Sequence, residues 1–309
     1  MKRVLVVLDP TAEEQPALQR AAWLARHLPA ELELFVCEYD QYLAGERFFD
    51  SAALEKARMS LIDNRLRALR ERAAELERQG LKVRVDARWD HPLHDGIVRK
   101  VSESPPDLVL KDTHYHAVLR RSIFSNTDWN LIRTCPSPLW LVKPRPVGAT
   151  PHVLAAVDPL HEHDKPAELD HRILAAAKEI AEAVRGELHV FHAYDIAPAL
   201  AVSTDAMTMP IAMPVRELAD ALKRRHGDAV FALTDGHGID RRRVHLLEGA
   251  TRQLLVELSE QLPADLVVIG AVSRSGLKRL FLGSTAEQVL DHLPCDVLII
   301  KPAAPPAEQ

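Results

Sequence analysis

The sequence predicts an α/β protein made of two tandem doubly wound domains, each a parallel sheet flanked by helices. Short apolar runs rich in β-branched residues alternate with longer amphipathic stretches, which is typical of parallel sheets with helical crossovers. The same order of elements recurs in the second half of the chain. A proline-rich stretch, 144–151, joins the two copies and has the composition of a linker.

The first half contains one complete set of these alternating strands and helices. Thr11–Glu14 has the form of a capping box, which predicts a helix from there to about His27. Gly80 predicts the end of the second helix. The predicted strands are 4–8, 31–38, 81–85, 107–110 and 139–142. The predicted helices are 11–27, 51–78, 92–101 and 127–134.

Three motifs of the first half return in the second. The matching pairs are Val4–Pro10 with Val153–Pro159, Asp107–Leu110 with Asp265–Val268, and Val142–Pro144 with Ile300–Pro302. We therefore predict domains at 1–146 and 151–304, with a longer middle region in the second and a frayed tail beyond it.

Composition excludes several classes of function. The net charge of −5 gives no overall field that would favour nucleic acid or an anionic membrane. No apolar run has the length of a membrane span, and the apolar run near the N-terminus is too short for a signal peptide. Three distant cysteines without a CxxC pattern argue against a disulfide framework and favour a reducing cytoplasm.

One stretch has the form of an anion site. The predicted strand 265–269 leads into a loop bounded by Gly270 and Gly283, and a helix is predicted at 284–293. A helix N-terminus has unpaired N–H groups and partial positive charge, which suit a phosphate. Glycines let the backbone approach a ligand, although the alternative is that they only turn the chain.

Several motifs together resemble tandem members of the universal stress protein family. They are Leu5–Pro10, Gln15–Leu18, Asp107–Lys111, Thr127–Trp129, Cys135–Pro138, Phe281–Gly283, Thr285–Leu293 and Ile300–Pro302. The resemblance covers nearly the whole chain. It implies a five-stranded parallel sheet per domain in the order 3-2-1-4-5, and a cytoplasmic stress-response role. Many members bind ATP through a G-x-x-G-x9-G-S/T loop and others do not bind it, so the resemblance implies ATP or a related nucleotide, with Mg²⁺, as the cofactor if one is bound.

This resemblance suggests one ligand site in the second domain. In that strand order the ligand crevice lies between strands 1 and 4. Asp158 would lie near the nucleoside, and the phosphates would contact the residues Gly270, Gly283, Ser284 and Thr285. The second glycine of the family loop falls on Ser273, which opposes close approach of a phosphate. Nearby cations, Arg274, Lys278 and Arg279, either compensate or are solvated loop charges.

The first half lacks the features of that loop. Its matching residues are Asp112, Tyr115, Ser125 and Asn126, so both glycines are replaced and a carboxylate is added. We expect no phosphate site in the first domain, where Asp9 alone is weak support for another one.

Other constellations have structural explanations. We considered metal ligation by His114 and His116 with Asp112, and by His161, His163 and His171 with Asp164, but solvated polar loops are the preferred interpretation and we expect no metal ligands. The Met- and Pro-rich segment 196–214 fits core filling, an apolar-ligand groove or a flap. The aromatic residues Phe124, Trp129 and Trp140 are expected to pack in the core or an interface.

The sequence contains no catalytic motif such as G-x-S-x-G, H-E-x-x-H or Walker A. We therefore predict a binding or sensing module for a small molecule. The alternatives are a scaffold or binder of a lipid-linked or apolar ligand, and a slow Mg²⁺-dependent ATPase. The apolar strands 139–142 and 297–300 are expected to pair as a pseudo-dimer within the chain, with a homodimer as a further expectation.

Overall fold

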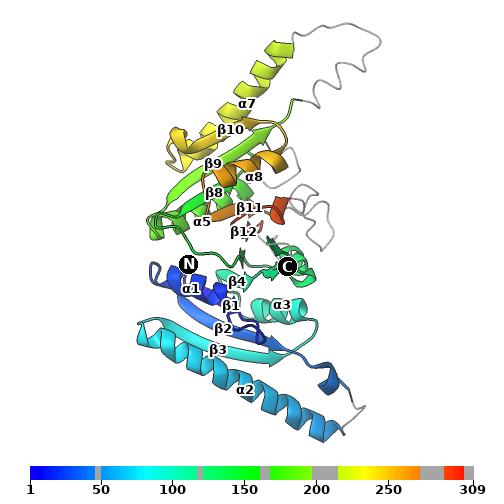
Figure 1. The fold of residues 1–309 in the computed structure, drawn as a ribbon. Helices are drawn as coiled ribbons and strands as arrows, with labels where there is room; N and C mark the ends of the chain where they lie inside the picture. The colour runs from blue at the N-terminus through cyan, green and yellow to red at the C-terminus, as the bar shows by residue number, and fades with distance from the viewer. Residues whose placement is uncertain (46–49, 117–120, 161–167, 197–214, 272–288, 303–309) are drawn as a thin grey trace, which may run out of the picture. The chain divides into compact units, whose positions relative to one another are not determined.

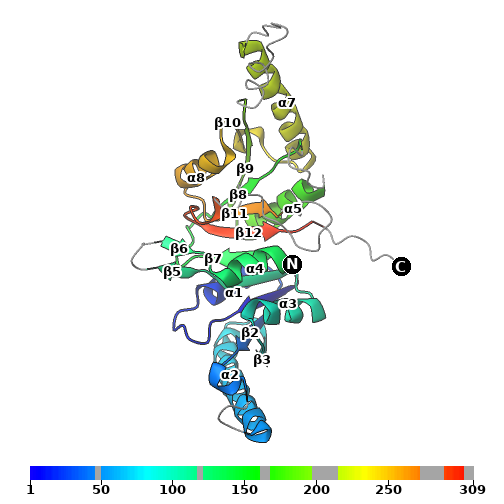
Figure 2. The same cartoon turned by 90° about the vertical axis from the view of Figure 1, so that its right-hand side faces the viewer.

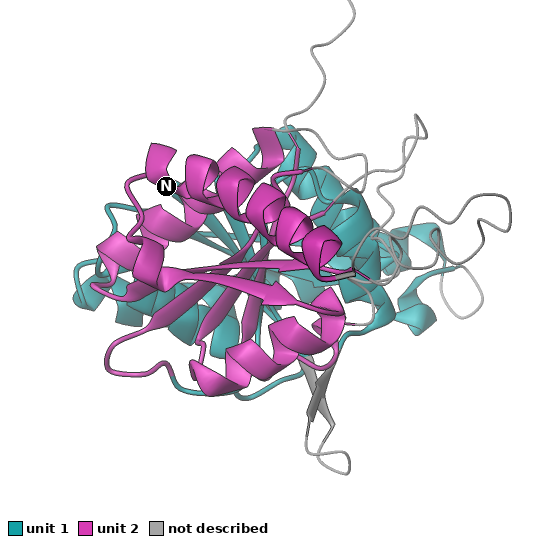
Figure 3. Cartoon of the chain, turned by 90° about the horizontal axis from the view of Figure 1, so that it is seen from above, with its two compact units in different colours: residues 1–146 teal, residues 147–309 magenta. Residues whose placement is uncertain are grey.

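A computed structural model describes the chain except residues 46–49, 117–120, 161–167, 197–214, 272–288 and 303–309, and except the side chains of 114–123 and 215. It divides the chain into two compact units, unit 1 from Met1 to Pro146 and unit 2 from Val147 to Gln309 (Figure 3). The predicted pairing of strands 139–142 and 297–300 stays a prediction.

Unit 1 alternates strands and helices, as predicted (Figure 1). Its elements are β1 (Arg3–Val7), α1 (Pro16–Ala25), β2 (Glu31–Glu38), η1 (Gln41–Leu43), α2 (Ser51–Arg78), β3 (Lys82–Trp89), α3 (Leu93–Glu103), β4 (Leu108–Asp112), β5 (His114–His116), β6 (Arg121–Ile123), α4 (Asn126–Thr134) and β7 (Leu139–Val142). The strands form a parallel sheet in the order β7-β4-β1-β2-β3. The short strands β5 and β6 form a separate antiparallel hairpin (Figure 2), which the sequence did not predict.

Unit 2 repeats this architecture. Its elements are β8 (His152–Ala156), α5 (Glu168–Ala183), β9 (Glu187–Tyr194), α7 (Val215–Gly236), η2 (Arg241–Arg243), β10 (Val244–Glu248), α8 (Thr251–Gln261), β11 (Leu266–Gly270) and β12 (Asp296–Ile300). The strands are parallel in the order β10-β9-β8-β11-β12. Helices flank the sheet in each unit (Figure 3). The predicted class and the 3-2-1-4-5 strand order are therefore confirmed.

A repeated aspartate explains why the motif before strand 4 recurs. In unit 2, the carboxylate of Asp265 accepts hydrogen bonds from the backbone N–H groups of Gly148 and His152, both at 2.9 Å. In unit 1, Asp107 accepts from Lys2 at 2.5 Å and Arg3 at 3.0 Å. In each unit the aspartate therefore ties the start of strand 1 to the start of strand 4.

The cores follow from the apolar runs. The β1 residues Val4–Val7 and the β4 residues Leu108–Leu110 are buried, and Trp140 of β7 is 2% exposed. Phe124 is buried, with its ring centroid 5.4 Å from that of Trp129, so the predicted aromatic packing is present in unit 1. A strand covered by helices on both faces must be apolar on both, which is the observed pattern.

The start of α1 differs from the prediction. The helix begins at Pro16 rather than Thr11, and Thr11 is not a helix cap. Its backbone N–H and hydroxyl instead donate to Asp9 Oδ1 at 2.8 and 2.6 Å, which closes a local turn. Proline suits the first helical position because its missing N–H needs no partner there.

The long helix α2 matches its predicted bounds. Asp50 caps its first turn through a hydrogen bond from the Ala53 N–H at 2.7 Å, and Gly80 follows its end with φ of +86°. Its buried residues lie mostly toward the C-terminal end: Leu54, Leu69, Ala73 and Leu76. Among the helices that the structure describes, none is long and apolar enough to cross a membrane.

Candidate functional site

The candidate site lies at the carboxyl ends of two neighbouring strands of unit 2. β8 pairs with β11 in parallel, and Asp158 follows β8 while Gly270 ends β11. The sheet order reverses between these strands, because β9 follows β8 on the other side. Ligands of open α/β sheets bind at such a switch point. The structure therefore brings Asp158 and Gly270 to one edge, as the sequence predicts.

Asp158 has a carboxylate oxygen that lacks a partner within the described part of the chain. Its backbone N–H donates to Oδ1 of the buried Asp170, in the first turn of α5, at 3.0 Å. Its own Oδ2 is buried and has no hydrogen-bond partner among the described residues. Buried polar atoms almost always have a partner, so an orphaned oxygen at a switch point marks a position for a ligand donor.

Gly270 has a packing role of its own. A Cβ atom there would lie 2.7 Å from Leu169 Cδ2 and 3.1 Å from Ile173 Cδ1, both on α5. The first distance is shorter than real Cβ contacts. The glycine therefore lets α5 lie directly over the end of β11. This role was not predictable from the sequence because it depends on how the helix packs.

The remaining predicted ligand residues, Ser273, Gly283, Ser284 and Thr285, lie outside the described residues, as do Arg274, Lys278 and Arg279. So do the Met- and Pro-rich segment from 197 onward and the histidines His161 and His163. The side chains of His114, His116 and Tyr115 are also outside the described part. The predicted roles of these residues stay predictions.

Two buried histidines stand beside Asp158. His192 Nδ1 lies 3.0 Å from the Val157 carbonyl oxygen, and His192 Nε2 lies 2.8 Å from His226 Nδ1. The ring of His226 also stacks on Tyr194, with centroids 5.1 Å apart. Burial lowers the pKa of His192, so it is neutral at pH 7. Sequence reasoning missed the pair because its members lie on a strand and a helix distant in the chain.

The matching crevice of unit 1 is acidic. A cavity of about 310 Å³ is lined there by Asp9, Glu14 and Asp112, with Lys111 and Thr127. The Lys111 ammonium donates to buried Asp128 Oδ1 at 2.8 Å. Asp112 Oδ1 accepts the Ala17 N–H at 2.5 Å, which holds α1 at the end of β4. These carboxylates oppose a phosphate electrostatically, and the absence of a phosphate site in this half stays a prediction.

Cys37 also lines this cavity. Burial, with smaller contributions from neighbouring charges, raises the pKa of its thiol to about 12. The thiolate is therefore scarce at neutral pH, and Cys37 is not an activated nucleophile. All three cysteines are buried and free, as expected.

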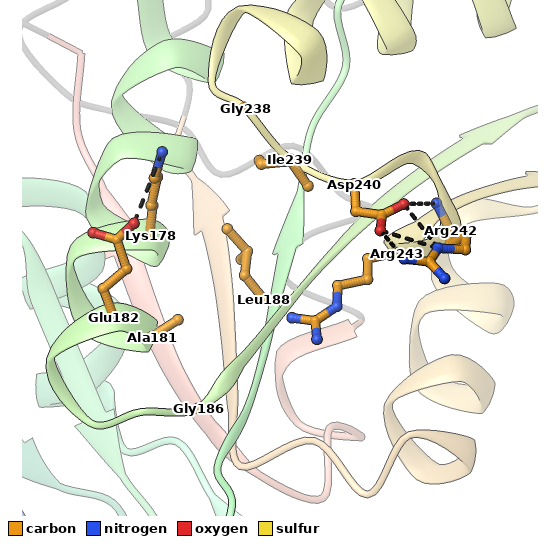
Figure 4. Close-up of a pocket in the computed structure, with 10 residues that line it drawn as sticks. All are labelled: Lys178, Ala181, Glu182, Gly186, Leu188, Gly238, Ile239, Asp240, Arg242 and Arg243. Atoms are coloured by element: carbon orange, nitrogen blue, oxygen red, sulfur yellow. Dashed lines mark hydrogen bonds and ion pairs between the residues drawn. The ribbon is translucent and has the colours of Figure 1, made fainter.

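A larger cavity lies elsewhere, near the amino ends of the strands in unit 2 (Figure 4). It measures about 540 Å³ and is lined by Lys178, Glu182, Asp240, Arg242 and Arg243 among others. Several of these charges are already engaged: Lys178 donates to the His237 carbonyl at 2.7 Å, and Arg242 pairs with Asp240 at 2.5 Å. The cavity does not include the switch-point residues, so volume does not identify the candidate site.

Comparisons with known proteins agree with this architecture. The profile of the Universal stress protein family matches residues 1–143 and 151–301. The chain is 33% identical to universal stress protein E of Escherichia coli over 305 residues, which cover 97% of this chain and 94% of that protein. It is 28% identical to the universal stress protein E homolog of Haemophilus influenzae, with 98% of each chain covered.

Solved structures give the same result. A putative universal stress protein from Pseudomonas aeruginosa superposes with a TM-score of 0.74 at 28% identity, covering 97% of this chain and 93% of that one. A universal stress protein from Archaeoglobus fulgidus, at 16% identity and a TM-score of 0.65, shares the fold over 97% of this chain and 98% of that one. The resemblance inferred from the motifs is confirmed, and the chain belongs to the universal stress protein family.

Proposed function

We propose that this chain is a cytoplasmic binding or sensing protein whose second unit takes one nucleotide, ATP or a related compound, in the crevice between Asp158 and Gly270. The observation that carries the proposal is the buried Oδ2 of Asp158 at the switch point of the sheet, which has no hydrogen-bond partner among the residues that the structure describes. A carboxylate at such a crevice accepts hydrogen bonds from ribose hydroxyls in other open α/β folds. That is the contact assigned to Asp158 here.

The phosphate contacts in this proposal come from the loop after β11. Gly283 allows close backbone approach, and Ser284 and Thr285 provide hydroxyls at a predicted helix start. Ser273 replaces a family glycine, which lowers the affinity that we expect. Arg274 and Lys278 offset part of that loss by attracting the phosphates.

Unit 1 gives the proposal an internal control. Its crevice has the same position in the fold but three lining carboxylates, Asp9, Glu14 and Asp112. Like charges at about 4 Å repel by about 4 kcal/mol at intermediate dielectric, so a triphosphate is excluded there. We therefore expect no more than one nucleotide per chain.

Calorimetry of the full chain with ATP, with and without Mg²⁺, tests this proposal. We expect binding of one nucleotide, at least about tenfold weaker in Asp158→Asn because a charge-assisted hydrogen bond is lost. Asp9→Asn is the matched control, because it alters the corresponding aspartate of unit 1 and should leave binding unchanged. Gly283→Val should abolish binding, while Tyr115→Phe should change it little.

Three results separate the alternatives. Two equivalent nucleotides per chain, or binding unaffected by Asp158→Asn and Gly283→Val, would contradict the proposal. Steady-state phosphate release from ATP and Mg²⁺ would establish the ATPase alternative. Mass spectrometry of the natively purified chain would favour the apolar-ligand alternative if it found a lipid-linked molecule and no nucleotide.

A further inference from the structure

A group of potential metal ligands lies at the amino edge of the sheet in unit 2, opposite the crevice. His152 begins β8 and Glu187 begins β9, and the two residues are paired across the strands. His189 is two residues beyond Glu187 and so points to the same face. One ligand atom from each of these three side chains lies within 4.8 Å of the other two. The register of parallel strands creates this cluster from residues distant in sequence.

Two buried nitrogen atoms distinguish the cluster. His152 Nδ1 and His189 Nε2 are both buried and have no hydrogen-bond partner among the described residues. His189 is 9% exposed, so water has little access to it. Glu187 Oε2 lies 3.5 Å from His189 Nε2, an ion-pair separation rather than a good hydrogen bond. Buried polar atoms rarely stay unpaired, and a cation between these atoms would satisfy them.

A third histidine orients the cluster. His245 on β10 has its Nε2 atom 3.1 Å from His189 Nδ1, and the two rings are 5.3 Å apart. When His189 Nδ1–H donates to His245, the His189 Nε2 lone pair is directed away from that bond and is available to a metal. A hydrogen bond to the second ring nitrogen is the usual support of a metal-binding histidine. His245 is therefore a positioning residue.

The charges around the cluster have both signs. Burial, and then the neighbouring histidines, lower the pKa of His189, and burial lowers the pKa of His245. Glu187 supplies a negative charge, while the Arg243 guanidinium, 3.7 Å from the Glu187 carboxylate, opposes a second cation.

We propose that His152, Glu187 and His189 bind a divalent transition-metal ion such as zinc. Two imidazoles and a carboxylate are a donor set that zinc accepts. Atoms bonded tetrahedrally to one zinc ion at about 2.1 Å lie about 3.4 Å apart, so ligand atoms now as much as 4.8 Å apart must close by about 1 Å or more on binding. This site is separate from the nucleotide crevice, and it departs from our sequence-based expectation of no metal ligands.

Zinc titration of the full chain against a chromophoric chelator tests the site. We expect one zinc ion whose affinity falls at least tenfold in His152→Asn and in Glu187→Gln, because each change removes a ligand. His94→Gln is the matched control: His94 Nε2 also lies 3.5 Å from a carboxylate, that of Asp95, but belongs to no such cluster in the described part of the chain. Its affinity for zinc should equal that of the wild type.

Two further variants separate coordination from a general loss of structure. His245→Gln should weaken zinc binding by about 10- to 100-fold, the usual effect of removing an outer partner. Arg243→Gln should strengthen it, which unfolding cannot do. The proposal is overturned if the wild type binds no zinc, or if His152→Asn and Glu187→Gln bind zinc as well as His94→Gln does.

Discussion

The two units differ at the end of strand 4, where the strand contacts the first helix of the unit. At the end of strand 4, unit 1 has Lys111 and Asp112, and unit 2 has Ile269 and Gly270 at the same positions of β4 and β11. Asp112 holds the first helix of unit 1 through a hydrogen bond to the Ala17 N–H. Gly270 instead admits Leu169 of α5 against the strand. A duplicated fold therefore keeps its topology while the residue that ends strand 4 changes from a helix-binding aspartate to a glycine.

Exchanging the strand residues should damage unit 1 most. Lys111→Ile introduces the unit 2 residue but leaves the carboxylate of Asp128, 0% exposed, without its cation. We expect a loss of about 3–5 kcal/mol in the free energy of unfolding. All four tryptophans lie in unit 1, so urea denaturation followed by tryptophan fluorescence reports this unit. Adding Asp128→Asn should recover part of the loss; no recovery would contradict the ion-pair explanation.

The reverse exchange should destabilise unit 2. Gly270→Asp places a carboxylate against Leu169 and Ile173, which combines overpacking with a charge in apolar surroundings. We expect a loss of about 3 kcal/mol, measured by far-UV circular dichroism because unit 2 contains no tryptophan. Gly236→Asp is the control, since nothing lies within 4 Å of a Cβ there. Equal effects of the two changes would refute the packing role.

Mild acid should also distinguish the units. In unit 2, burial lowers the pKa of His189 and His192 below the ordinary value of 6.5. The unfolded chain then binds more protons than the folded one, so stability falls as pH drops below about 6.5. We therefore expect a lower free energy of unfolding for unit 2 at pH 5.5 than at pH 7.5.

Unit 1 should keep its stability over the same range. Its shifted carboxyl groups, Asp86, Asp90 and Asp107, have pKa values below 3.8, because charge partners and backbone N–H donors outweigh the opposing effect of burial. The stability that they contribute is lost only as pH falls below about 4. Denaturation at pH 7.5 and at pH 5.5, followed by both fluorescence and circular dichroism, checks this expectation. A larger loss of stability measured by fluorescence than by circular dichroism would contradict it.

The smallest expected effect concerns the hydrogen bond that distinguishes unit 1. Asp112→Ala removes the acceptor of the Ala17 N–H at the start of α1, where no side-chain cap is present. The expected loss is about 1 kcal/mol, typical of a helix cap. Fluorescence-detected urea unfolding measures it. Glu13→Ala, an exposed change just before the helix, should leave stability within about 0.5 kcal/mol of wild type.

Features set by local sequence could be predicted, whereas features set by side-chain contacts or by the packing of distant segments could not. Strands such as Leu139–Val142 were predictable because burial on both faces demands continuous apolar runs. The start of α1 was not, because the Asp9 side chain binds Thr11 in a turn that resembles a cap in sequence. The partnership of His152 with His189 was not predictable either, because it depends on strand order and register. The packing role of Gly270 required knowing which helix lies over it.

The 28-residue length of α2 determines how its backbone is protected from solvent (Figure 1). A helix of this length spans about 42 Å, whereas the eight residues of β3 extend about 26 Å. The turns around Met59, 56% exposed, therefore lack the burial that stabilises the turns at Leu69–Leu76. Amide hydrogen exchange should be graded along one continuous helix, fast in its first half and slow in its second. Limited proteolysis should cut the same first half before any other part of α2.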